Sequence, residues 1–136
     1  MGFYTRASIA ANLVAQRRFD DAASMTRALP NEPGDWVVPH TMWRSARGQA
    51  LARLGRPEEA VALAADAAAL SEPTDDLNLR GDALVAQADV LGACGRDADA
   101  RRSALAAVAL YEAKGNVVMA QRARALAETA GHAPTA

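Results

Sequence analysis

Adjacent acidic residues are the first candidates for chemistry in this chain. They occur as three pairs, Asp20–Asp21, Glu58–Glu59 and Asp75–Asp76. General acid–base catalysis needs two carboxyl groups that share a pocket and have separated pKa values. Neighbouring residues on a helix do not face each other, and each pair is predicted to lie at a helix start, where the helix dipole favours anions. The pairs therefore predict helix N-termini, and no catalytic centre.

Two histidines and one cysteine are the other candidates. His40 and His132 lie far apart in the chain, without the spacing of metal ligands, so no metal and no cofactor is predicted. Cys94 aligns with Leu54, 40 residues earlier, and is expected to be a buried hydrophobic residue at a helix end. A single cysteine cannot close a disulfide within the chain, which fits a reducing compartment and predicts a cytoplasmic protein.

Four arginines form a basic cluster on or just after one predicted helix: Arg44, Arg47, Arg53 and Arg56. The segment from His40 to Gly55 contains no acidic residue. One interpretation is a solvated helix face that is balanced by acidic residues on the next helix. The other is a site for an acidic peptide or a phosphate-bearing ligand, which arginine binds through paired hydrogen bonds.

Composition limits the class of protein. The 136 residues are 51% hydrophobic but only 4% aromatic, and much of the hydrophobic fraction is alanine, which favours helices over sheets. The formal net charge of -1 gives no reason to expect nucleic acid or an anionic membrane surface as a partner. The first residues lack a signal-peptide pattern, and no apolar run reaches the length of about 18 residues that a membrane helix needs.

Hydrophobic periodicity predicts an all-α chain with seven helices, at about 3–15, 19–29, 39–54, 57–70, 76–93, 97–113 and 117–129. Asp97 and Asn116 are predicted N-caps, and Gly55, Gly95 and Gly115 are predicted helix ends. The segment from Pro30 to Gly34 forms the longest predicted loop. We expect one domain at 1–130 and a frayed tail at 131–136.

An internal repeat organises these helices. The segment Gly55-Arg56-Pro57-Glu58-Glu59-Ala60 lines up with Gly95-Arg96-Asp97-Ala98-Asp99-Ala100, 40 residues later, and a weaker copy runs from Arg17 to Ala22. Each copy predicts a tight turn between two helices, followed by a small residue where the helices touch. One such pair cannot bury its apolar face alone, so neighbouring pairs must stack.

The repeated segment, with helices on both sides, resembles the tetratricopeptide repeat (TPR), although the spacing exceeds the usual repeat of about 34 residues. This resemblance implies a right-handed superhelical stack of about three antiparallel helix pairs (3–29, 39–70 and 76–113) plus a capping helix at 117–129. Segments such as Trp43–Arg47, Leu51–Arg56, Gly81–Leu84 and Ala109–Asn116 are also similar to the C-terminal repeats of large bacterial cyclase/ATPase or transcription-regulator proteins. That similarity covers about residues 5–129 and implies a regulatory tail, either as a fragment or as a stand-alone relative.

The TPR resemblance implies a partner-binding concave face that is lined by the first helix of each pair. The residues at the matching positions are Tyr4, Asn12, Ser45, Gln49, Arg53, Val85 and Asp89. Ala7, Ala11 and Gly81 stand where a clamp for C-terminal carboxylates needs polar residues, so that clamp is not expected. Trp43 is predicted to lie in the core, and Trp36 is either packed or exposed as an anchor for a partner.

Three functions follow as hypotheses, and none of them is enzymatic. The first is a non-catalytic module that binds a protein or peptide. The second is a homodimer that forms through the N-terminal apolar face, at Phe3, Tyr4 and Ile9. The third is an effector-sensing domain, which would need a deep pocket with convergent polar groups. In the last helix, Val117, Val118, Ala120, Ala123 and Leu126 are expected to form the side that covers the preceding pair.

Overall fold

The computed structural model describes residues 2–28 and 36–131, and these residues form seven α-helices and no strand. The helices are α1 (Phe3–Ala15), α2 (Phe19–Arg27), α3 (Val37–Arg53), α4 (Pro57–Ser71), α5 (Leu77–Ala93), α6 (Asp97–Lys114) and α7 (Val117–Gly131). Every helix was predicted, and each boundary lies within two residues of its expected place. The predicted loop from Pro30 to Gly34 and residues 132–136 of the predicted tail lie outside the described residues. Gly131, assigned to the tail from the sequence, is instead the last residue of α7.

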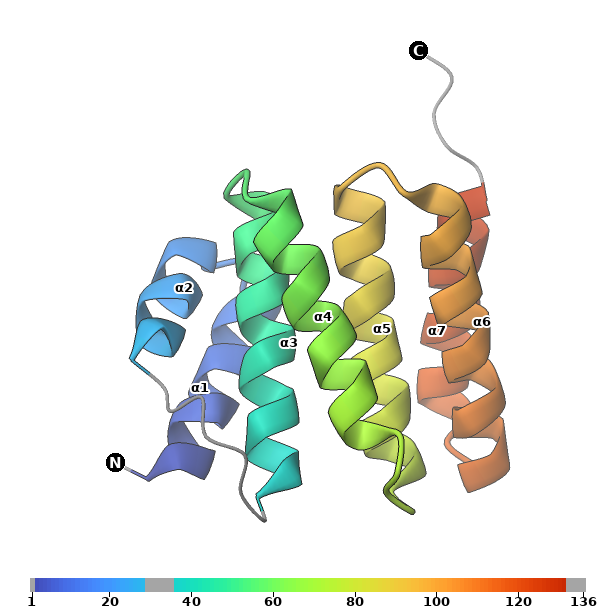
Figure 1. The fold of residues 1–136 in the computed structure, drawn as a ribbon. Helices are drawn as coiled ribbons and strands as arrows, with labels where there is room; N and C mark the ends of the chain where they lie inside the picture. Colours follow the sequence, from blue (N-terminus) through green and yellow to red (C-terminus); the bar gives the residue numbers. More distant parts are fainter. Residues whose placement is uncertain (1, 29–35, 132–136) are drawn as a thin grey trace.

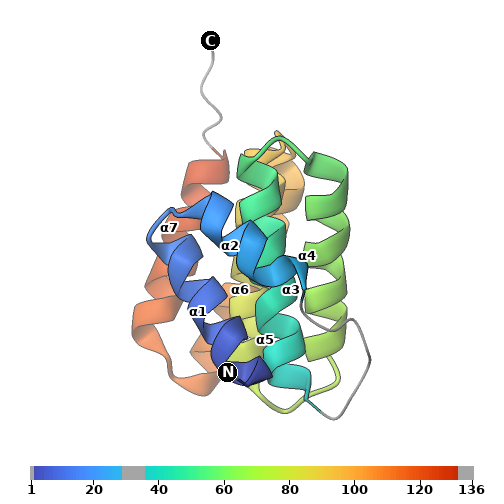
Figure 2. The same cartoon turned by 90° about the vertical axis from the view of Figure 1, so that its left-hand side faces the viewer.

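The helices form hairpins that stack side by side (Figure 1). Helices α1 and α2, α3 and α4, and α5 and α6 pack as pairs, and α3 also packs on both α1 and α5. Helix α7 packs mainly on α6 and touches α5. The view in Figure 2 shows two layers, with α1 and α7 on one side and α4 on the other. The middle odd-numbered helices, α3 and α5, therefore have neighbours on several sides.

The tight turns share one local geometry. Gly55, Gly95 and Gly115 have φ angles of 81°, 78° and 82°, in the left-handed region that costs glycine little. The next N–H then bonds back to a carbonyl in the last turn of the preceding helix, as from Arg56 to Leu51 at 2.9 Å, which satisfies an otherwise orphaned group. Arg17 occupies the same position in the first copy with a φ of 60° and no glycine.

A small residue follows each of these turns at the same distance along the chain. Ala22, Ala60 and Ala100 are all buried, as the repeat predicted. The structure adds a fourth copy, because Gly115 begins an equivalent turn before α7 and Ala120 is buried at the matching position. Since a methyl group keeps helix axes close, these alanines determine how tightly consecutive helices approach.

Two capping predictions had different outcomes. The side chain of Asn116 accepts a hydrogen bond from the backbone N–H of Met119 at 3.2 Å, as expected for an N-cap. The prediction for Asp97 was wrong, because Arg96 is the N-cap residue and Asp97 is the first residue inside α6. Asp76 caps α5 by accepting a bond from the N–H of Leu79 at 2.9 Å.

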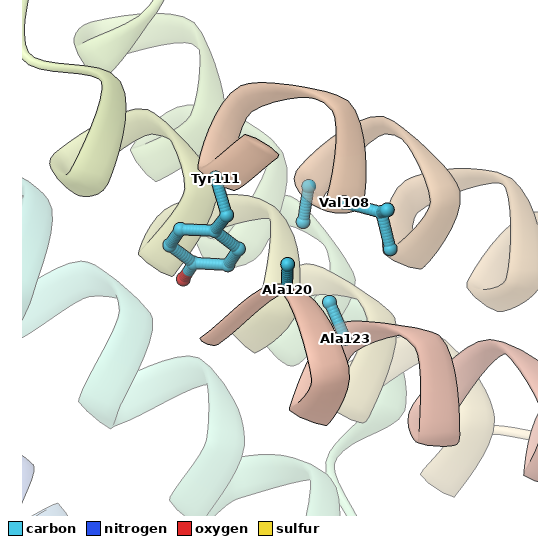
Figure 3. Packing of buried hydrophobic residues seen from close by; sticks show 5 residues of the cluster. Val108, Tyr111, Ala120 and Ala123 are labelled. Carbon is cyan, nitrogen blue, oxygen red and sulfur yellow. The ribbon is translucent and has the colours of Figure 1, made fainter. Parts of the chain in front are cut away.

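Most of the buried hydrophobic side chains are alanines, and a few large ones fill the spaces between them. Trp43 is 5% exposed, which confirms the core prediction. Tyr111 is fully buried between α6 and its neighbours, beside Ala120 of α7 (Figure 3). Its ring lies so close to Gly81 of α5 that a Cβ atom there would be 2.6 Å from it. Glycine is thus required by this contact.

The burial predictions for Val117, Val118 and Cys94 were wrong. Val117 and Val118 are each 65% exposed, because they begin α7 where no further helix packs, and the buried side of α7 consists of Ala120, Ala123 and Ala127. Leu54 is 40% exposed, and the equivalent Cys94 is only partly buried against the cluster that contains Leu51 and Val90. Both residues follow the last residue of a helix, where the chain has begun to leave the packed face.

The first stability prediction concerns Arg17. We expect Arg17→Gly to raise the free energy of unfolding by about 0.5–1 kcal/mol, because the strain of a left-handed non-glycine residue disappears while its contact with the Phe19 ring is lost. The matched change Gly55→Ala should lower it by about 1 kcal/mol. Urea unfolding of the three proteins measures both effects. A decrease for Arg17→Gly or an increase for Gly55→Ala would contradict this account of the turns.

The second stability prediction compares two helical glycines in α5. Gly81→Ala should lower the free energy of unfolding by about 2–3 kcal/mol, because the new methyl group overlaps the buried ring of Tyr111. Gly92→Ala should raise it by about 0.5–1 kcal/mol, because its nearest contact would be 4.0 Å away and alanine has the higher helix propensity. Equal effects in thermal unfolding would show that the contact between Gly81 and Tyr111 is not tight.

Candidate functional site

A groove of about 510 Å³ crosses the face formed by α1, α3 and α5. Such a volume is within the range of ligand sites in proteins. We call it the α1–α3–α5 groove, and its lining residues are Tyr4, Ala11, Val38, Thr41, Met42, Ser45, Ala46, Gln49, Asp76, Asn78, Leu79, Asp82, Ala83 and Ala86. The groove therefore draws on the first helix of each of three successive hairpins.

Helical periodicity aligns the polar groups of the groove. On α3, Thr41, Ser45 and Gln49 recur every fourth residue, so they form one row on the helix surface. On α5, Asn78 and Asp82 have the same spacing, and Asp76 lies at the N-terminal end of that helix. The packing of α3 on α5 then brings the two rows to opposite sides of the groove.

The charge of the groove is negative. Among its lining residues Asp76 and Asp82 are acidic, and none is a lysine, an arginine or a histidine. The hydroxyl of Tyr111 donates to Oδ1 of Asp82 at 2.5 Å. Asp82 is exposed as a residue, but partial removal of water from around its carboxyl group raises its pKa; the bond from Tyr111 opposes this rise and the charge of Asp76 adds to it.

Two hydroxyl groups in the groove have no hydrogen-bond partner among the described residues. They belong to Thr41, which is 2% exposed, and Ser45, which is 9% exposed, one turn apart on α3. A buried hydroxyl without a partner costs about 1–3 kcal/mol. Nε1 of Trp43 and Nε of Arg6 are also buried without a partner among these residues, but only Thr41 and Ser45 belong to the groove lining. Their hydroxyl oxygens are themselves covered, so a ligand in the groove would reach them only after the side chains rotate.

The structure brings together some of the seven residues that the sequence assigned to a binding face. Tyr4, Ser45 and Gln49 line the α1–α3–α5 groove. Arg53 and Asp89 line a neighbouring hollow of about 300 Å³ between α5 and α7. Asn12 is exposed on α1 but lines neither, and Val85 packs against the cluster that contains Val108 and Tyr111.

A polar network connects the two hollows. Asp89 accepts hydrogen bonds from Nε2 of Gln49 at 3.1 Å and from Nη2 of Arg53 at 2.5 Å. The guanidinium of Arg53 also lies 5.6 Å from the centre of the Phe19 ring. These contacts join α2, α3 and α5, so the side chains of Gln49 and Arg53 are held in place before any ligand binds.

The four residues of the basic cluster do not form one site. Arg47 donates from Nη1 to the carbonyl of Ala23 at 3.0 Å and to Oγ1 of Thr26 at 3.2 Å, which ties α3 to α2. Arg44 is buried and bonds to His40, Arg53 pairs with Asp89, and Arg56 pairs with Glu59. Each guanidinium thus contacts a different part of the fold, and none of the four residues lines the α1–α3–α5 groove.

Sequence reasoning missed four polar residues of the groove: Thr41, Asp76, Asn78 and Asp82. A signal for some of them was present. Thr41 lies one turn before Ser45, which had been assigned to the binding face, so extending that row toward the N-terminus of α3 would have found it. Asp82 was recognised only as part of a family-like segment, and its pairing with Tyr111 depends on the packing of α6 on α5.

Aromatic residues near the N-terminus differ in burial. Trp36 is 62% exposed, which settles its predicted alternatives in favour of exposure, and Tyr4 is 50% exposed. Phe3 and Ile9, two residues of the predicted dimer face, are partly buried within the chain, Phe3 beside Trp43 and Ile9 beside Leu13. Of that face, Tyr4 therefore offers the largest aromatic surface to a ligand.

The described ranges contain neither a cluster of metal-binding side chains nor a helix that could span a membrane. The residues in these ranges contain no group of three or more His, Cys, Asp or Glu side chains that could hold a metal ion. Within the same ranges, no helix combines the length and the apolar character that crossing a membrane requires. The acidic pairs lie at helix starts, with Asp20, Asp21, Glu58 and Glu59 in first turns.

The contact between His40 and Arg44 predicts a pH dependence of stability. His40 is 6% exposed, and Nη1 of Arg44 donates to its Nδ1 and to its carbonyl oxygen, each at 3.1 Å. Because guanidinium only donates, His40 is neutral with its proton on Nε2. Burial lowers the pKa of His40 and the charge of Arg44 lowers it further.

The unfolded chain therefore binds a proton on His40 at a higher pH than the folded chain does. Stability from this residue is complete above a pH of about 6.5 and is lost as the pH falls toward the lower folded pKa. We expect the free energy of unfolding to decrease from pH 7.5 to pH 5, and the His40→Gln variant to show less of this decrease. Identical pH profiles in urea unfolding would contradict the prediction; His132 is present in both proteins and cancels.

Comparison with known proteins supports the fold. No protein-family model matches the sequence, and no curated protein sequence does. A solved structure of a TPR-like protein from Chlorobium tepidum TLS superposes with a TM-score of 0.68 at 24% sequence identity, covering 96% of this chain and 94% of that one. With its stacked helix hairpins and repeated turns, the chain has an all-α, TPR-like fold.

Proposed function

We propose that this chain is a non-catalytic interaction module that binds a segment of another protein in the α1–α3–α5 groove. The unpaired hydroxyls of Thr41 and Ser45 in the groove are the observation that carries the proposal. A buried hydroxyl without a partner destabilises the free fold, and a ligand with hydrogen-bonding groups would supply a partner once each side chain rotates toward the groove.

The arrangement of the groove supports a protein segment as the ligand. It crosses three helices from three hairpins, and hydrogen bonds such as that between Gln49 and Asp89 hold its walls together. A rigid surface loses little conformational entropy on binding, which leaves more of the interaction energy for affinity. TPR-like folds act as scaffolds without chemistry of their own, and we propose the same for this chain.

A small-molecule effector is the second candidate. The groove volume of about 510 Å³ is also that of small-molecule sites, and polar side chains converge on it. A second hollow, of about 570 Å³ between α4, α5 and α6, contains neither of the unpaired hydroxyls, and its lining includes five alanines together with Ser71, Glu72, Arg80, Leu84, Gln87 and Leu110. The α1–α3–α5 groove is therefore the place to look for either ligand.

The cellular context that we propose is the reducing cytoplasm, because Cys94 is the chain's single cysteine. The same groove would serve a stand-alone module or the repeat tail of a bacterial regulatory protein, the context that residues 5–129 resemble. In the second case, capture of the partner's segment would be the signal that the tail passes to the rest of the protein.

The test is selection of ligands from a random peptide library against the whole chain, followed by nuclear magnetic resonance of a labelled sample. We expect selected peptides to shift the backbone amides around Thr41, Ser45 and Asp82. Tyr4→Ala, which removes an exposed aromatic wall of the groove, should weaken binding about tenfold.

Trp36→Ala is the matched control, since Trp36 is also an exposed aromatic side chain but does not line the groove. If Trp36→Ala abolished binding and Tyr4→Ala did not, the binding site would lie outside the groove. Shifts that concentrate on α4 and α6, or a selection that enriches no peptide, would refute the proposal. Retention of small metabolites in place of peptides would favour the second candidate.

A further inference from the structure

The chemistry of the groove restricts what its ligand can be. Two side chains that line it, Asp76 and Asp82, have carboxyl groups close enough for their charges to interact. No basic side chain of the groove lining balances them. A ligand that brought a carboxylate or a phosphate here would add a further negative charge beside these two exposed carboxyl groups, which would repel it.

The carboxyl group of Asp82 is only partly used by the fold. Tyr111 donates one hydrogen bond to Oδ1, and a carboxylate can accept several. Asp76 accepts the capping bond from Leu79 through its own Oδ1. Each aspartate therefore has an oxygen atom, Oδ2, for which no bond is required by the described fold, and both residues line the groove.

The opposite wall offers neutral groups of a different kind. Thr41 and Ser45 lie in a row with Gln49 on α3, and their hydroxyl oxygens, covered in the free protein, would reach a ligand once the side chains rotate. Hydroxyl groups both donate and accept, which suits the alternating N–H and C=O groups of an extended peptide backbone. The aromatic ring of Tyr4 on α1 adds a surface that attracts cations through its π electrons.

We propose that the α1–α3–α5 groove binds an extended, basic peptide segment. Its lysine or arginine side chain is held by Asp76 and Asp82, and its backbone pairs with Thr41 and Ser45. This inference rests on the proposed function and names the chemical class of the partner. The proposed ligand is opposite in charge to the acidic ligand that the arginine cluster had suggested. The fold uses arginines of that cluster, such as Arg47 and Arg53, for contacts between its own helices.

The charge is tested with two double variants of equal net charge. In Asp76→Asn/Asp82→Asn, asparagine retains the N-cap of α5 and an acceptor for Tyr111, so the fold is preserved while the groove loses its charge. The control, Asp66→Asn/Asp75→Asn, removes two charges from residues outside the groove lining. Circular dichroism and thermal unfolding establish that both variants are folded.

The probes are the peptides that the whole chain selects from the random library. We expect them to be enriched in lysine and arginine, and the groove variant to bind them at least about tenfold more weakly in fluorescence anisotropy. The control variant should bind within about twofold of the original chain. Replacement of the basic residues of a selected peptide by glutamine should reduce its affinity to a similar extent.

The hydroxyls are tested by a change whose two effects have opposite signs. Thr41→Val removes a buried hydroxyl that has no partner in the free protein, so the midpoint of thermal unfolding should rise. The same change removes a partner of the bound peptide, so affinity should fall about fivefold. A merely structural threonine would not weaken binding while its loss strengthened the fold.

The possible outcomes distinguish a failure of the basic-peptide inference from a failure of the proposed interaction function. Selected peptides that are neutral or acidic, or that bind both aspartate variants equally, would overturn the basic-peptide inference while the interaction module stands. A selection that enriches no peptide would overturn both. If free arginine amide bound as tightly as the selected peptides, the basic-peptide inference would also be overturned, because the peptide backbone would then contribute nothing to the affinity.

Discussion

Close approach of helices through small side chains is the constraint on which this structure depends. Alanine is the commonest buried residue, and Gly81 leaves space for the ring of Tyr111 where a methyl group would overlap it. Each alanine buries little apolar area, so the hydrophobic gain per residue is modest. Stability must therefore come from many regular contacts, repeated at each turn where Ala22, Ala60 or Ala100 meets the neighbouring helix.

This way of packing also leaves the outer face of the odd-numbered helices available. Alanines make many of the contacts between helices, and the polar row of Thr41, Ser45 and Gln49 on α3 lines the groove, with Thr41 and Ser45 themselves buried. Tyr111 connects the core to the groove. Its ring fills the space between helices, and its hydroxyl donates a hydrogen bond to Asp82 at the groove. The side chain that stabilises the third hairpin therefore also positions a charged group of the candidate site.

Arginine has an architectural role in this chain. Arg47 satisfies groups near the C-terminal end of α2, and Arg53 connects α3 to α5 through Asp89. A guanidinium can serve several acceptors from one position, which suits junctions between helices that lack large apolar side chains. With these cations used between helices, the groove retains a negative charge, and the electrostatic character of the site is opposite to that of the nearby basic segment of sequence.

The sequence by itself determined the features that depend on residues within one or two turns of each other. All seven helices, the glycine turns and the buried alanines after them follow from periodicity, backbone preferences and small side chains. Errors arose at helix ends: the N-cap of α6 lies one residue before Asp97, and the burial of Cys94 and Val117 depends on whether another helix covers the position.

Only the tertiary structure decided which polar residues share a site. Ser45 and Gln49 could be assigned to a binding face from a family pattern, but their approach to Asp82 requires α3 to pack on α5. The packing of the helices also decides that Arg44, Arg47 and Arg53 each bond to a different partner. Local patterns determine how a helix forms, whereas the packing of one hairpin on the next determines which of its faces meet a partner, another helix or water.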